Sequence, residues 1–201
     1  MKTIKLLLAT RNEDKVKEIR EVLKDLDIKI ISASQIDGLP EVEEDQDTLE
    51  GNAIKKARVL AKASGLPALA DDTGLEVEFL NGAPGVRSSR FAGENVTYDD
   101  NVDELLRRLQ DVPPEKRKAR FRTVVALAID DHIETVEGIC RGEILSERRG
   151  AGGFGYDPVF FVPEIGKTFA EMSLAEKNRI SHRGVALTKM RRLLQRKLLQ
   201  Q

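Results

Sequence analysis

The sequence lacks the features that mark secreted or membrane-spanning proteins. Its 201 residues include one cysteine, Cys140, so an intrachain disulfide is impossible and a reducing compartment is the natural setting. No apolar run approaches the roughly 20 residues of a membrane span, and the apolar segment 4–9 is too short for a signal sequence. We therefore expect a soluble, cytoplasmic protein without a membrane partner.

An excess of charge of one sign is also absent. The 33 Lys and Arg residues nearly balance 34 Asp and Glu residues, which leaves a formal net charge of −1. A protein that binds a nucleic-acid duplex needs a positive surface, and no interleaving of aromatic and basic residues replaces it here. We expect no nucleic-acid partner. Cys140 lies in an apolar, strand-like run, which favours a buried small hydrophobe over a nucleophile.

Strand and helix patterns alternate along the chain, whose length suits one well-buried core or two small lobes. Apolar residues recur three and four apart after Asn12, so we expect a helix there with Asn12 as its N-cap. Asp47 with Glu50, and Ser173 with Glu176, resemble capping boxes. The expected strands are 4–9, 27–32, 75–80, 119–130 and 133–140. The expected helices are 13–26, 47–65, 97–112, 173–180 and 181–199.

The central stretch 70–93 carries two adjacent carboxylates, Asp71 and Asp72, directly after a short apolar run. Thr73-Gly74 then predicts a turn into a half-buried strand, since apolar and acidic residues alternate from Leu75 to Leu80. Carboxylates at a strand end beside a glycine-rich loop suit a metal ion held against a ligand. A solvated turn is the alternative interpretation, because Asp is a common turn former.

The first third of the chain contains one candidate phosphate site and two other groups of polar residues. The loop 10–12 leads from a strand into a helix N-terminus, where free N–H groups attract anions, and Lys15 follows on the first turn. Asn52 and Lys56 lie four residues apart and share one helix face. Glu41 follows Pro40 in an acidic loop. Each of these features also has an ordinary solvated interpretation.

Two sequence patterns resemble nucleotide-binding motifs but lack the context that those motifs require. Gly150, Gly152 and Gly155 satisfy G-x-G-x-x-G, but Asp157-Pro158 follows instead of a helix, so we reject a dinucleotide fold. Gly166-Lys167-Thr168 resembles the end of a P-loop but lacks the upstream glycine. The glycines at 150–155 can instead let a ligand approach the backbone, with Phe154 offering either a flat face or ordinary core packing.

Five separated segments together resemble one family, the noncanonical purine nucleoside triphosphate pyrophosphatases, which include the inosine triphosphate pyrophosphatases. The segments are LATRNEDK at 8–15, EGNAIKKA at 50–57, ADDTGL at 70–75, GGFGYDP at 152–158 and SHRG at 181–184, with Lys177 preceding the last. They follow the family's order and spacing over almost the whole chain. Thr73 replaces the serine of many members and keeps the hydroxyl.

The resemblance implies a fold and an activity. It implies one domain over residues 1–201, of α/β class, with two lobes, a long mixed central sheet flanked by helices and an active-site cleft between the lobes. It also implies a homodimer that hydrolyses ITP, dITP and XTP to the monophosphate and pyrophosphate with Mg²⁺, which cleanses the nucleotide pool.

The resemblance also assigns roles to individual positions. Asp72 matches the proton acceptor, Lys15 a catalytic lysine, and Glu41 with Asp72 the metal-associated carboxylates. The substrate contacts match Thr10, Arg11, Asn12, Glu13, Asp14, Lys15, Lys56, Thr73, Phe154, Gly155, Tyr156, Asp157, Lys177, His182 and Arg183. Asp71 and Glu50 are expected to act only as supporting residues around these.

These roles suggest in-line attack of water on the α-phosphorus, with Asp72 orienting and deprotonating the water. Arg183 or His182 would donate to the 6-oxygen of the base, and Phe154 would stack on its ring. Two alternatives stay open. The chain could be a related pyrophosphatase acting on modified pyrimidine or common nucleotides, or a nucleotide-binding regulator without turnover.

Overall fold

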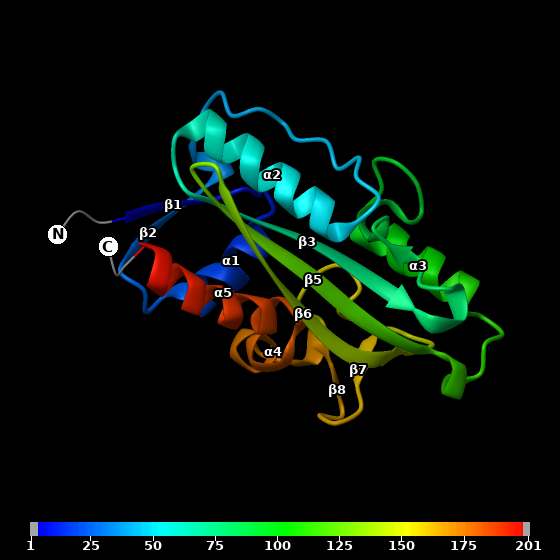
Figure 1. The fold of residues 1–201 in the computed structure, drawn as a ribbon. Helices are drawn as coiled ribbons and strands as arrows, with labels where there is room; N and C mark the ends of the chain where they lie inside the picture. Colours follow the sequence, from blue (N-terminus) through cyan, green and yellow to red (C-terminus); the bar gives the residue numbers. More distant parts are fainter. Residues whose placement is uncertain (1–3, 199–201) are drawn as a thin grey trace. The chain divides into compact units, whose positions relative to one another are not determined.

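Eight strands form one mixed sheet in the computed structural model, which describes residues 4–198 (Figure 1). The strands are β1 (Ile4–Leu8), β2 (Ile28–Ser32), β3 (Ala68–Val77), β4 (Pro84–Gly85), β5 (Lys118–Ile129), β6 (His132–Ile144), β7 (Phe160–Val162) and β8 (Lys167–Thr168). Their order is β2-β1-β3-β5-β6-β7-β8, and β4 pairs with β3. β1 runs parallel to β2 and β3, whereas β7 is antiparallel to its neighbours.

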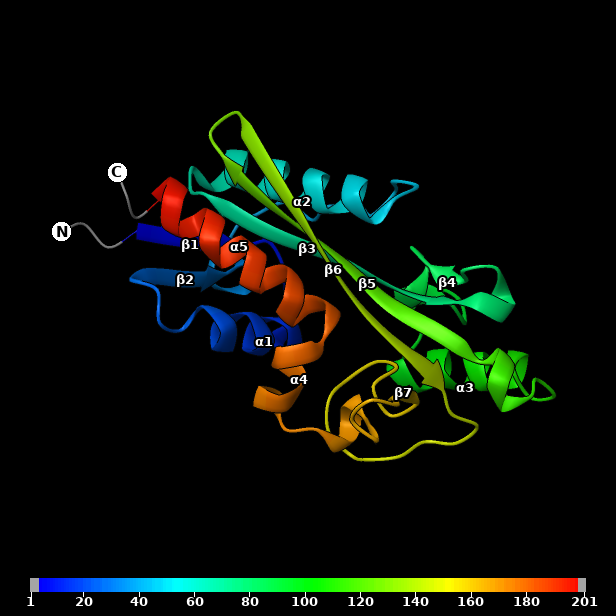
Figure 2. The same ribbon diagram turned by 60° about the horizontal axis from the view of Figure 1, so that its bottom comes forward.

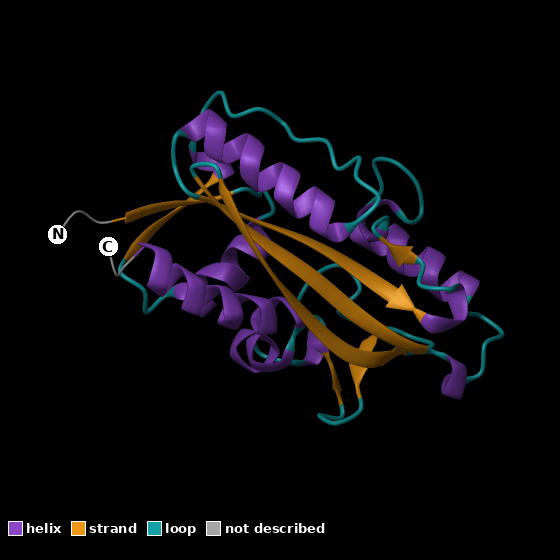
Figure 3. Cartoon of the chain, viewed as in Figure 1, coloured by secondary structure: helices purple, strands orange, loops and turns teal. Residues whose placement is uncertain are grey.

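Five α-helices accompany these strands in the described part of the chain (Figure 3). They are α1 (Glu13–Leu23), α2 (Leu49–Ser64), α3 (Tyr98–Arg108), α4 (Leu174–Ile180) and α5 (His182–Leu198). The predicted α/β class and mixed sheet flanked by helices are confirmed. None of the described helices is long and apolar enough to cross a membrane.

The chain divides into two compact units. Unit 1 holds residues 4–72, 123–138 and 182–198 of the described chain, and unit 2 holds residues 73–122 and 139–181. The long strands β3, β5 and β6 each contribute residues to both units. The predicted cleft between two lobes stays a prediction.

Unit 1 is a layered α/β structure, because its strands are apolar on both faces. Leu6 and Leu8 of β1 belong to a buried cluster with α1 and α5, whereas Leu7 between them points to the opposite face. Figures 1 and 2 show α2 on that opposite face, away from α1 and α5. Ala53 and Ala57 are fully buried along α2, so small side chains let this helix lie close to its neighbours.

Unit 2 has its own core, rich in phenylalanine. The rings of Phe121 and Phe160 lie 4.7 Å apart between centroids, and Phe169 lies 4.9 Å from Phe160. Leu105 of α3 and Cys140 of β6 pack into the same cluster. Burial, with a smaller contribution from a nearby carboxylate, raises the pKa of the Cys140 thiol to about 11, which agrees with the predicted role as a small hydrophobe.

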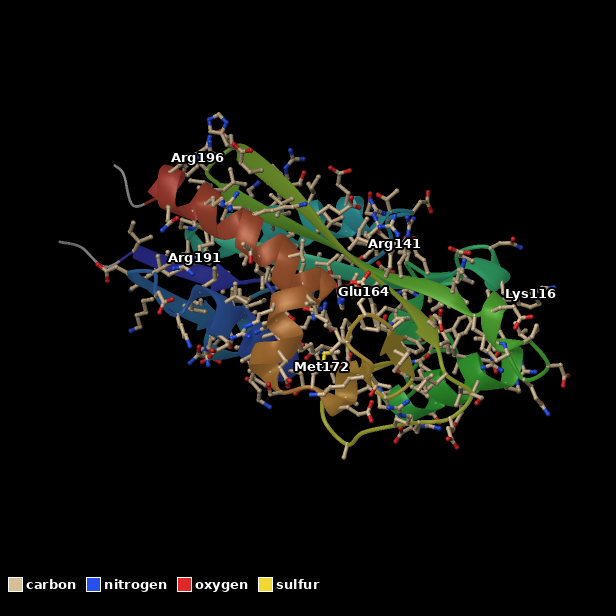
Figure 4. The ribbon with its side chains drawn as sticks, turned by 90° about the horizontal axis from the view of Figure 1, so that it is seen from below. Lys116, Arg141, Glu164, Met172, Arg191 and Arg196 are labelled. Atoms are coloured by element: carbon tan, nitrogen blue, oxygen red, sulfur yellow. The ribbon has the colours of Figure 1, made fainter. Side chains whose placement is uncertain are left out.

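Two cationic residues of α5, Arg191 and Lys197, form ion pairs on the surface of unit 1. Arg191 lies 3.6 Å from Asp25, and Lys197 lies 3.0 Å from Glu134. Figure 4 labels Arg191 and Arg196 on this helix. The side chains of both pairs are accessible to solvent, so this face of α5 is solvated. Exposed pairs of this kind contribute little to the free energy of unfolding.

Most helix boundaries agree with the sequence patterns. Asn12 caps α1, Thr97 caps α3 with Asp100, and Ser173 with Glu176 forms the predicted capping box. The break between α4 and α5 occurs at Ser181, as predicted. The expected end of the last helix at residue 199 lies outside the described residues.

Two local predictions are wrong. Thr48, not Asp47, caps α2, because its side chain accepts from the N–H of Gly51. Thr73-Gly74 does not form a turn, since β3 continues through both residues to Val77 and a short 3₁₀ turn follows at Glu78–Leu80. The carboxylates of 71–72 therefore lie inside a strand, and the solvated-turn interpretation is also wrong.

Candidate active site

The strand β3 separates two adjacent carboxylates by pointing them in opposite directions. Side chains alternate along a strand, so Asp71 shares the face of Leu69, which packs with α1 and α5. Asp72 points to the other face and meets residues of α2. Both side chains are buried, at 3 % and 5 % exposure. These neighbours in the sequence therefore have different side-chain hydrogen-bond and ion-pair partners.

Asp71 lies at the centre of a buried ionic cluster, here called the Asp71 cluster: Lys15, Glu18, Asp71 and Arg183. The Lys15 ammonium is 3.1 Å from Asp71 Oδ2, and Arg183 donates to the same oxygen through Nε at 3.2 Å and Nη2 at 3.0 Å. Arg183 Nη1 donates to Glu18. Lys15 is the most accessible member, at 18 % side-chain exposure.

Two cations hold Asp71 in its ionised form. Burial opposes ionisation, but the charges of Lys15 and Arg183 outweigh it and keep the pKa of Asp71 well below its usual range. The carboxylates of Asp71 and Glu18 likewise outweigh burial and raise the pKa of Arg183. Asp71 is therefore a fixed negative charge at any physiological pH.

Asp72 belongs to a second group, here called the Lys56 cluster: Glu44, Asn52, Lys56 and Asp72. Lys56 Nζ donates to Glu44 Oε1 at 2.6 Å, to the backbone oxygen of Asp71 at 2.7 Å and to Asp72 Oδ1 at 3.1 Å. Asn52 Nδ2 donates to Asp72 Oδ2 at 3.2 Å. The shared face of α2 predicted for Asn52 and Lys56 is confirmed.

The electrostatics of the Lys56 cluster differ from those of the Asp71 cluster. Burial is the largest influence on Asp72, and together with the negative charge of Glu44 it raises the pKa of Asp72 above its usual value, against the opposing charge of Lys56. Burial opposes the charge of Lys56, but Asp72 and Glu44 overcome it and raise its pKa. Asp72 is the aspartate better matched to accept a proton.

The loop before α1 is held by its own side chains. Asn12 Oδ1 accepts from the N–H groups of Asp14 at 3.0 Å and Lys15 at 3.1 Å, and Asn12 N–H donates to Thr10 Oγ1 at 3.1 Å. Arg11 donates to the backbone oxygen of Leu39 at 3.1 Å. The cap uses two of the N–H groups expected to face a phosphate, so the ammonium of Lys15 is the stronger candidate for that contact.

The acidic residues of the first turn of α1 also form ordinary surface contacts. Glu13 accepts from Ser34 Oγ at 3.2 Å, and Asp14 lies 3.3 Å from the Lys17 ammonium. Both serve the turn and the helix dipole, as negative charge near a helix N-terminus does. Their predicted substrate contacts stay predictions.

In unit 2, the glycine-rich loop before Pro158 is held by one carboxylate. Asp157 Oδ2 accepts from the N–H of Phe154 at 2.8 Å and from Lys177 Nζ at 2.5 Å. The Lys177 ammonium also lies 4.8 Å from the centroid of the Phe154 ring. A Cβ at Gly153 would overlap the Asp157 carboxylate, so glycine is required there. Asp157 therefore holds the loop in position.

The other predicted residues have more varied positions. Tyr156 is buried in unit 2 and donates to the backbone oxygen of Ser88 at 2.9 Å, which indicates a packing role. Gly155 has φ +60°, and Thr73 is half-buried in β3. In unit 1, His182 begins α5 and is 3 % exposed. A Cβ at Gly138 would overlap the backbone of His182, so this glycine lets β6 approach the first turn of α5.

Glu41 is exposed, and the acidic-loop residue that contacts Lys56 is Glu44. Glu50 is also exposed; its carboxylate accepts from Thr135 at 3.4 Å. No group of three or more His, Cys, Asp or Glu side chains is arranged to hold a metal ion in residues 4–198.

Comparison with known proteins gives the family. The Ham1 family matches residues 6–193, which is most of the chain. The chain belongs to the Ham1 family. It is 52 % identical over 194 residues to the dITP/XTP pyrophosphatase of Desulforamulus reducens, a match that covers 96 % of each chain. It is 47 % identical over 196 residues to the dITP/XTP pyrophosphatase of Caldanaerobacter subterraneus, covering 97 % of this chain and 98 % of that one.

Solved structures of Ham1 proteins resemble this one closely. The Coxiella burnetii HAM1 protein superposes with a TM-score of 0.87 at 44 % identity, over 96 % of this chain and 99 % of its own. The Staphylococcus aureus Ham1 protein gives a TM-score of 0.84 at 36 % identity with the same coverage. The resemblance inferred from five sequence segments is therefore confirmed at the level of the family.

Two members of the clusters were missed from sequence. Glu18 lies three residues after Lys15 and beside Ile19 on the buried face of α1, so a charge on an apolar stripe was a usable signal. Glu44 had no such signal, because it is one of several acidic residues in an irregular loop. Only the position of the Lys56 ammonium distinguishes it from its neighbours.

Proposed function

We propose that this chain hydrolyses noncanonical purine nucleoside triphosphates, namely ITP, dITP and XTP, to the monophosphate and pyrophosphate. The observation that carries the proposal is the difference between two adjacent residues of β3. Asp71 is paired with the cations Lys15 and Arg183, and Asp72 has a raised pKa. Members of the Ham1 family named dITP/XTP pyrophosphatases at 52 % and 47 % identity support the same substrate class.

Lys15 would contact the triphosphate. It is the accessible cation of the Asp71 cluster, whereas Arg183 is almost fully enclosed. Asp71 would fix Lys15 in position, because the two groups lie 3.1 Å apart and Arg183 holds the same carboxylate oxygen. A pre-positioned cation stabilises the developing negative charge without rearranging during the reaction.

Asp72 would act as the general base. A water oxygen would attack the α-phosphorus, the bond to the bridging oxygen would break, and pyrophosphate would leave. The proton of the water would pass to Asp72, whose second oxygen is held by Asn52. Asp71 is paired with two cations, which lower its pKa, whereas Asp72 contacts one cation and has a raised pKa. A carboxylate with a raised pKa is the better proton acceptor, which favours Asp72 over Asp71.

The donor chemistry of the Lys56 cluster fits Mg²⁺. Glu44 Oε1 and Asp72 Oδ1 both accept from the Lys56 ammonium, so these two carboxylate oxygens lie close together. Mg²⁺ typically takes one or two carboxylates with phosphate and water oxygens, and when bound it would offset the charge of the triphosphate. We assign this role to Asp72 and Glu44; Glu41, expected from sequence, stays an alternative.

The base would be recognised by His182, Arg183 and Phe154, as the resemblance implies. A donor aimed at the 6-oxygen of hypoxanthine or xanthine is left unpaired against the 6-amino group of adenine, which disfavours ATP. Phe154 would stack on the ring, and Lys177 with Asp157 would hold the Phe154 loop. The active form would be a homodimer in the cytoplasm, and size-exclusion chromatography tests the dimer.

One substrate panel tests the proposal. Pyrophosphate release is measured from ITP, dITP, XTP, the four common triphosphates and modified pyrimidine triphosphates, with and without Mg²⁺. We expect Mg²⁺-dependent release that is strongest for the three 6-oxo purines. Preference for pyrimidines would favour a related pyrophosphatase, and binding of ITP without product would favour a nucleotide-binding regulator.

A further inference from the structure

Tyr98, a residue outside the segments that resemble the family, contacts the ring of Phe154 within unit 2. The two ring centroids are 5.8 Å apart and the planes are inclined by 44°. Tyr98 is 45 % exposed, one of few large apolar side chains so accessible in the described chain. An exposed aromatic ring beside another aromatic ring is a surface suited to a third flat group.

The backbone that carries Tyr98 is firmly held. Tyr98 is the first residue of α3, and Thr97 before it forms a capping box with Asp100. Asn101 donates to the backbone oxygen of Ser89 at 3.1 Å and accepts from the N–H of Ala92 at 2.9 Å. These contacts fix the first turn of the helix, so the exposure of Tyr98 does not come from a loose segment.

The Phe154 side of the pair is joined to the same turn. Arg148, which lies before the glycine-rich loop, is 2.9 Å from Asp103 Oδ1 and donates to the backbone oxygen of Asp99 at 3.3 Å. Beyond the loop, Asp157 holds the N–H of Phe154. The capped first turn of α3 holds Tyr98 and the Asp157 carboxylate holds Phe154, so the mutual position of the two rings is built into unit 2.

We propose that Tyr98 is a second aromatic contact for the purine, extending the surface that Phe154 provides. A purine has two fused rings and is larger than a phenyl ring, so a purine stacked on Phe154 projects beyond its edge. The Tyr98 ring lies 5.8 Å from Phe154, within reach of the projecting part. This inference rests on the proposed function, because it assumes that Phe154 carries the base.

The size of the base also predicts a preference for purines over pyrimidines. A pyrimidine has one ring and can be covered by Phe154 alone, so Tyr98 would favour purines over pyrimidines. The contact would be equal before and during the reaction, because the base is remote from the α-phosphorus. Loss of such uniform binding raises KM and leaves kcat unchanged.

Tyrosine fluorescence is a direct probe of ligand binding at Tyr98. It contains no tryptophan and only two tyrosines, Tyr98 and Tyr156. Tyr156 is buried and donates to Ser88, so it should respond little to a ligand on Tyr98. Inosine monophosphate can be titrated while tyrosine emission is recorded, and calorimetry measures the same binding independently. No turnover is required for either measurement.

Three variants separate binding from structure. In the wild type we expect inosine monophosphate to quench tyrosine emission. Tyr98→Phe should bind with nearly unchanged Kd but lose the quenching, whereas Tyr98→Ala should raise Kd, and KM for ITP, about three- to tenfold. Cytidine monophosphate should show a smaller effect of Tyr98→Ala. Phe79→Ala, another exposed aromatic of unit 2 at 48 %, is the matched control and should change neither constant.

Several results would overturn the proposal. Unchanged Kd and KM in Tyr98→Ala would remove Tyr98 from the site, as would quenching that persists in Tyr98→Phe. An equal loss in Phe79→Ala would indicate a general effect of removing a surface ring. Binding and quenching by inosine monophosphate without pyrophosphate release from ITP would support Tyr98 and contradict the hydrolytic function. The absence of both binding and release would contradict both.

Discussion

Asp71 and Asp72 are adjacent in β3, yet their carboxylates have no side-chain partner in common among the contacts described above. Asp71 is paired with Lys15 and Arg183, and Asp72 with Lys56 and Asn52. The pKa of Asp71 is lowered and the pKa of Asp72 is raised. Two identical side chains thus have different partners and opposite pKa shifts, because neighbouring strand residues point to opposite faces.

Replacing Asp72 should remove turnover without unfolding the protein. Asp72→Asn keeps an oxygen for the Lys56 ammonium and loses only the hydrogen bond from Asn52, but it cannot accept a proton from water. We expect kcat for pyrophosphate release from ITP to fall at least about 100-fold, the usual contribution of a general base. Near-normal turnover at saturating Mg²⁺ would remove Asp72 from this role, and an unchanged melting curve is the control for folding.

Replacing Asp71 should mainly reduce stability. Asp71→Asn leaves Arg183 and Lys15 with one fewer buried negative charge, and breaking a buried ion pair typically costs about 3–5 kcal/mol. Urea denaturation at neutral pH should show this loss of unfolding free energy. A decrease of less than about 1 kcal/mol would mean that Glu18 compensates for Asp71.

The same residue predicts an acid dependence of stability. The folded pKa of Asp71 is below the usual value near 3.8, so its stabilising effect is complete above that value and is lost as the pH falls below it. The wild-type advantage over Asp71→Asn should therefore shrink as denaturation curves are measured from about pH 5 downward. A constant difference across this range would contradict the assignment.

The acid limb of the pH–rate profile should report Asp72. Its pKa is raised by burial and by the charge of Glu44, so kcat/KM should fall as Asp72 becomes protonated. Glu44→Gln removes one raising influence, and the acid limb of its residual activity should move to lower pH. Lys56→Met removes the opposing positive charge and should move the limb to higher pH. If the acid limbs of the wild type, Glu44→Gln and Lys56→Met coincide, a group other than Asp72 controls the acid limb.

Arg183 should affect both stability and substrate choice. Its guanidinium joins Asp71 and Glu18, and the family resemblance assigns it to the base. We expect Arg183→Ala to lower the melting temperature and to reduce the ratio of kcat/KM for ITP over ATP about tenfold, since a donor to the 6-oxygen is lost. A lowered melting temperature with an unchanged ratio would make Arg183 a positioning residue for Asp71 only.

Much of this protein could be predicted from local patterns. The apolar spacing located α1, α2, α3 and α5, and the capping signals at Asn12, Thr97 and Ser173 agree with the structure. The family followed from five short segments whose residue types and spacing suffice without coordinates. These features depend on neighbours within a few residues, which is why a sequence determines them by itself.

The remaining features needed the tertiary structure. Thr73-Gly74 resembles a turn, but pairing of Leu75 and Glu76 with β4 extends the strand through it. That continuity, with α1 and α5 on one face and α2 on the other, decided which aspartate meets Arg183 and which meets Lys56. The selection of Glu44 from an acidic loop and the pairing of Tyr98 with Phe154 likewise depend on residues distant in sequence. Local periodicity carries no information about such contacts, because they arise only when separate segments pack together.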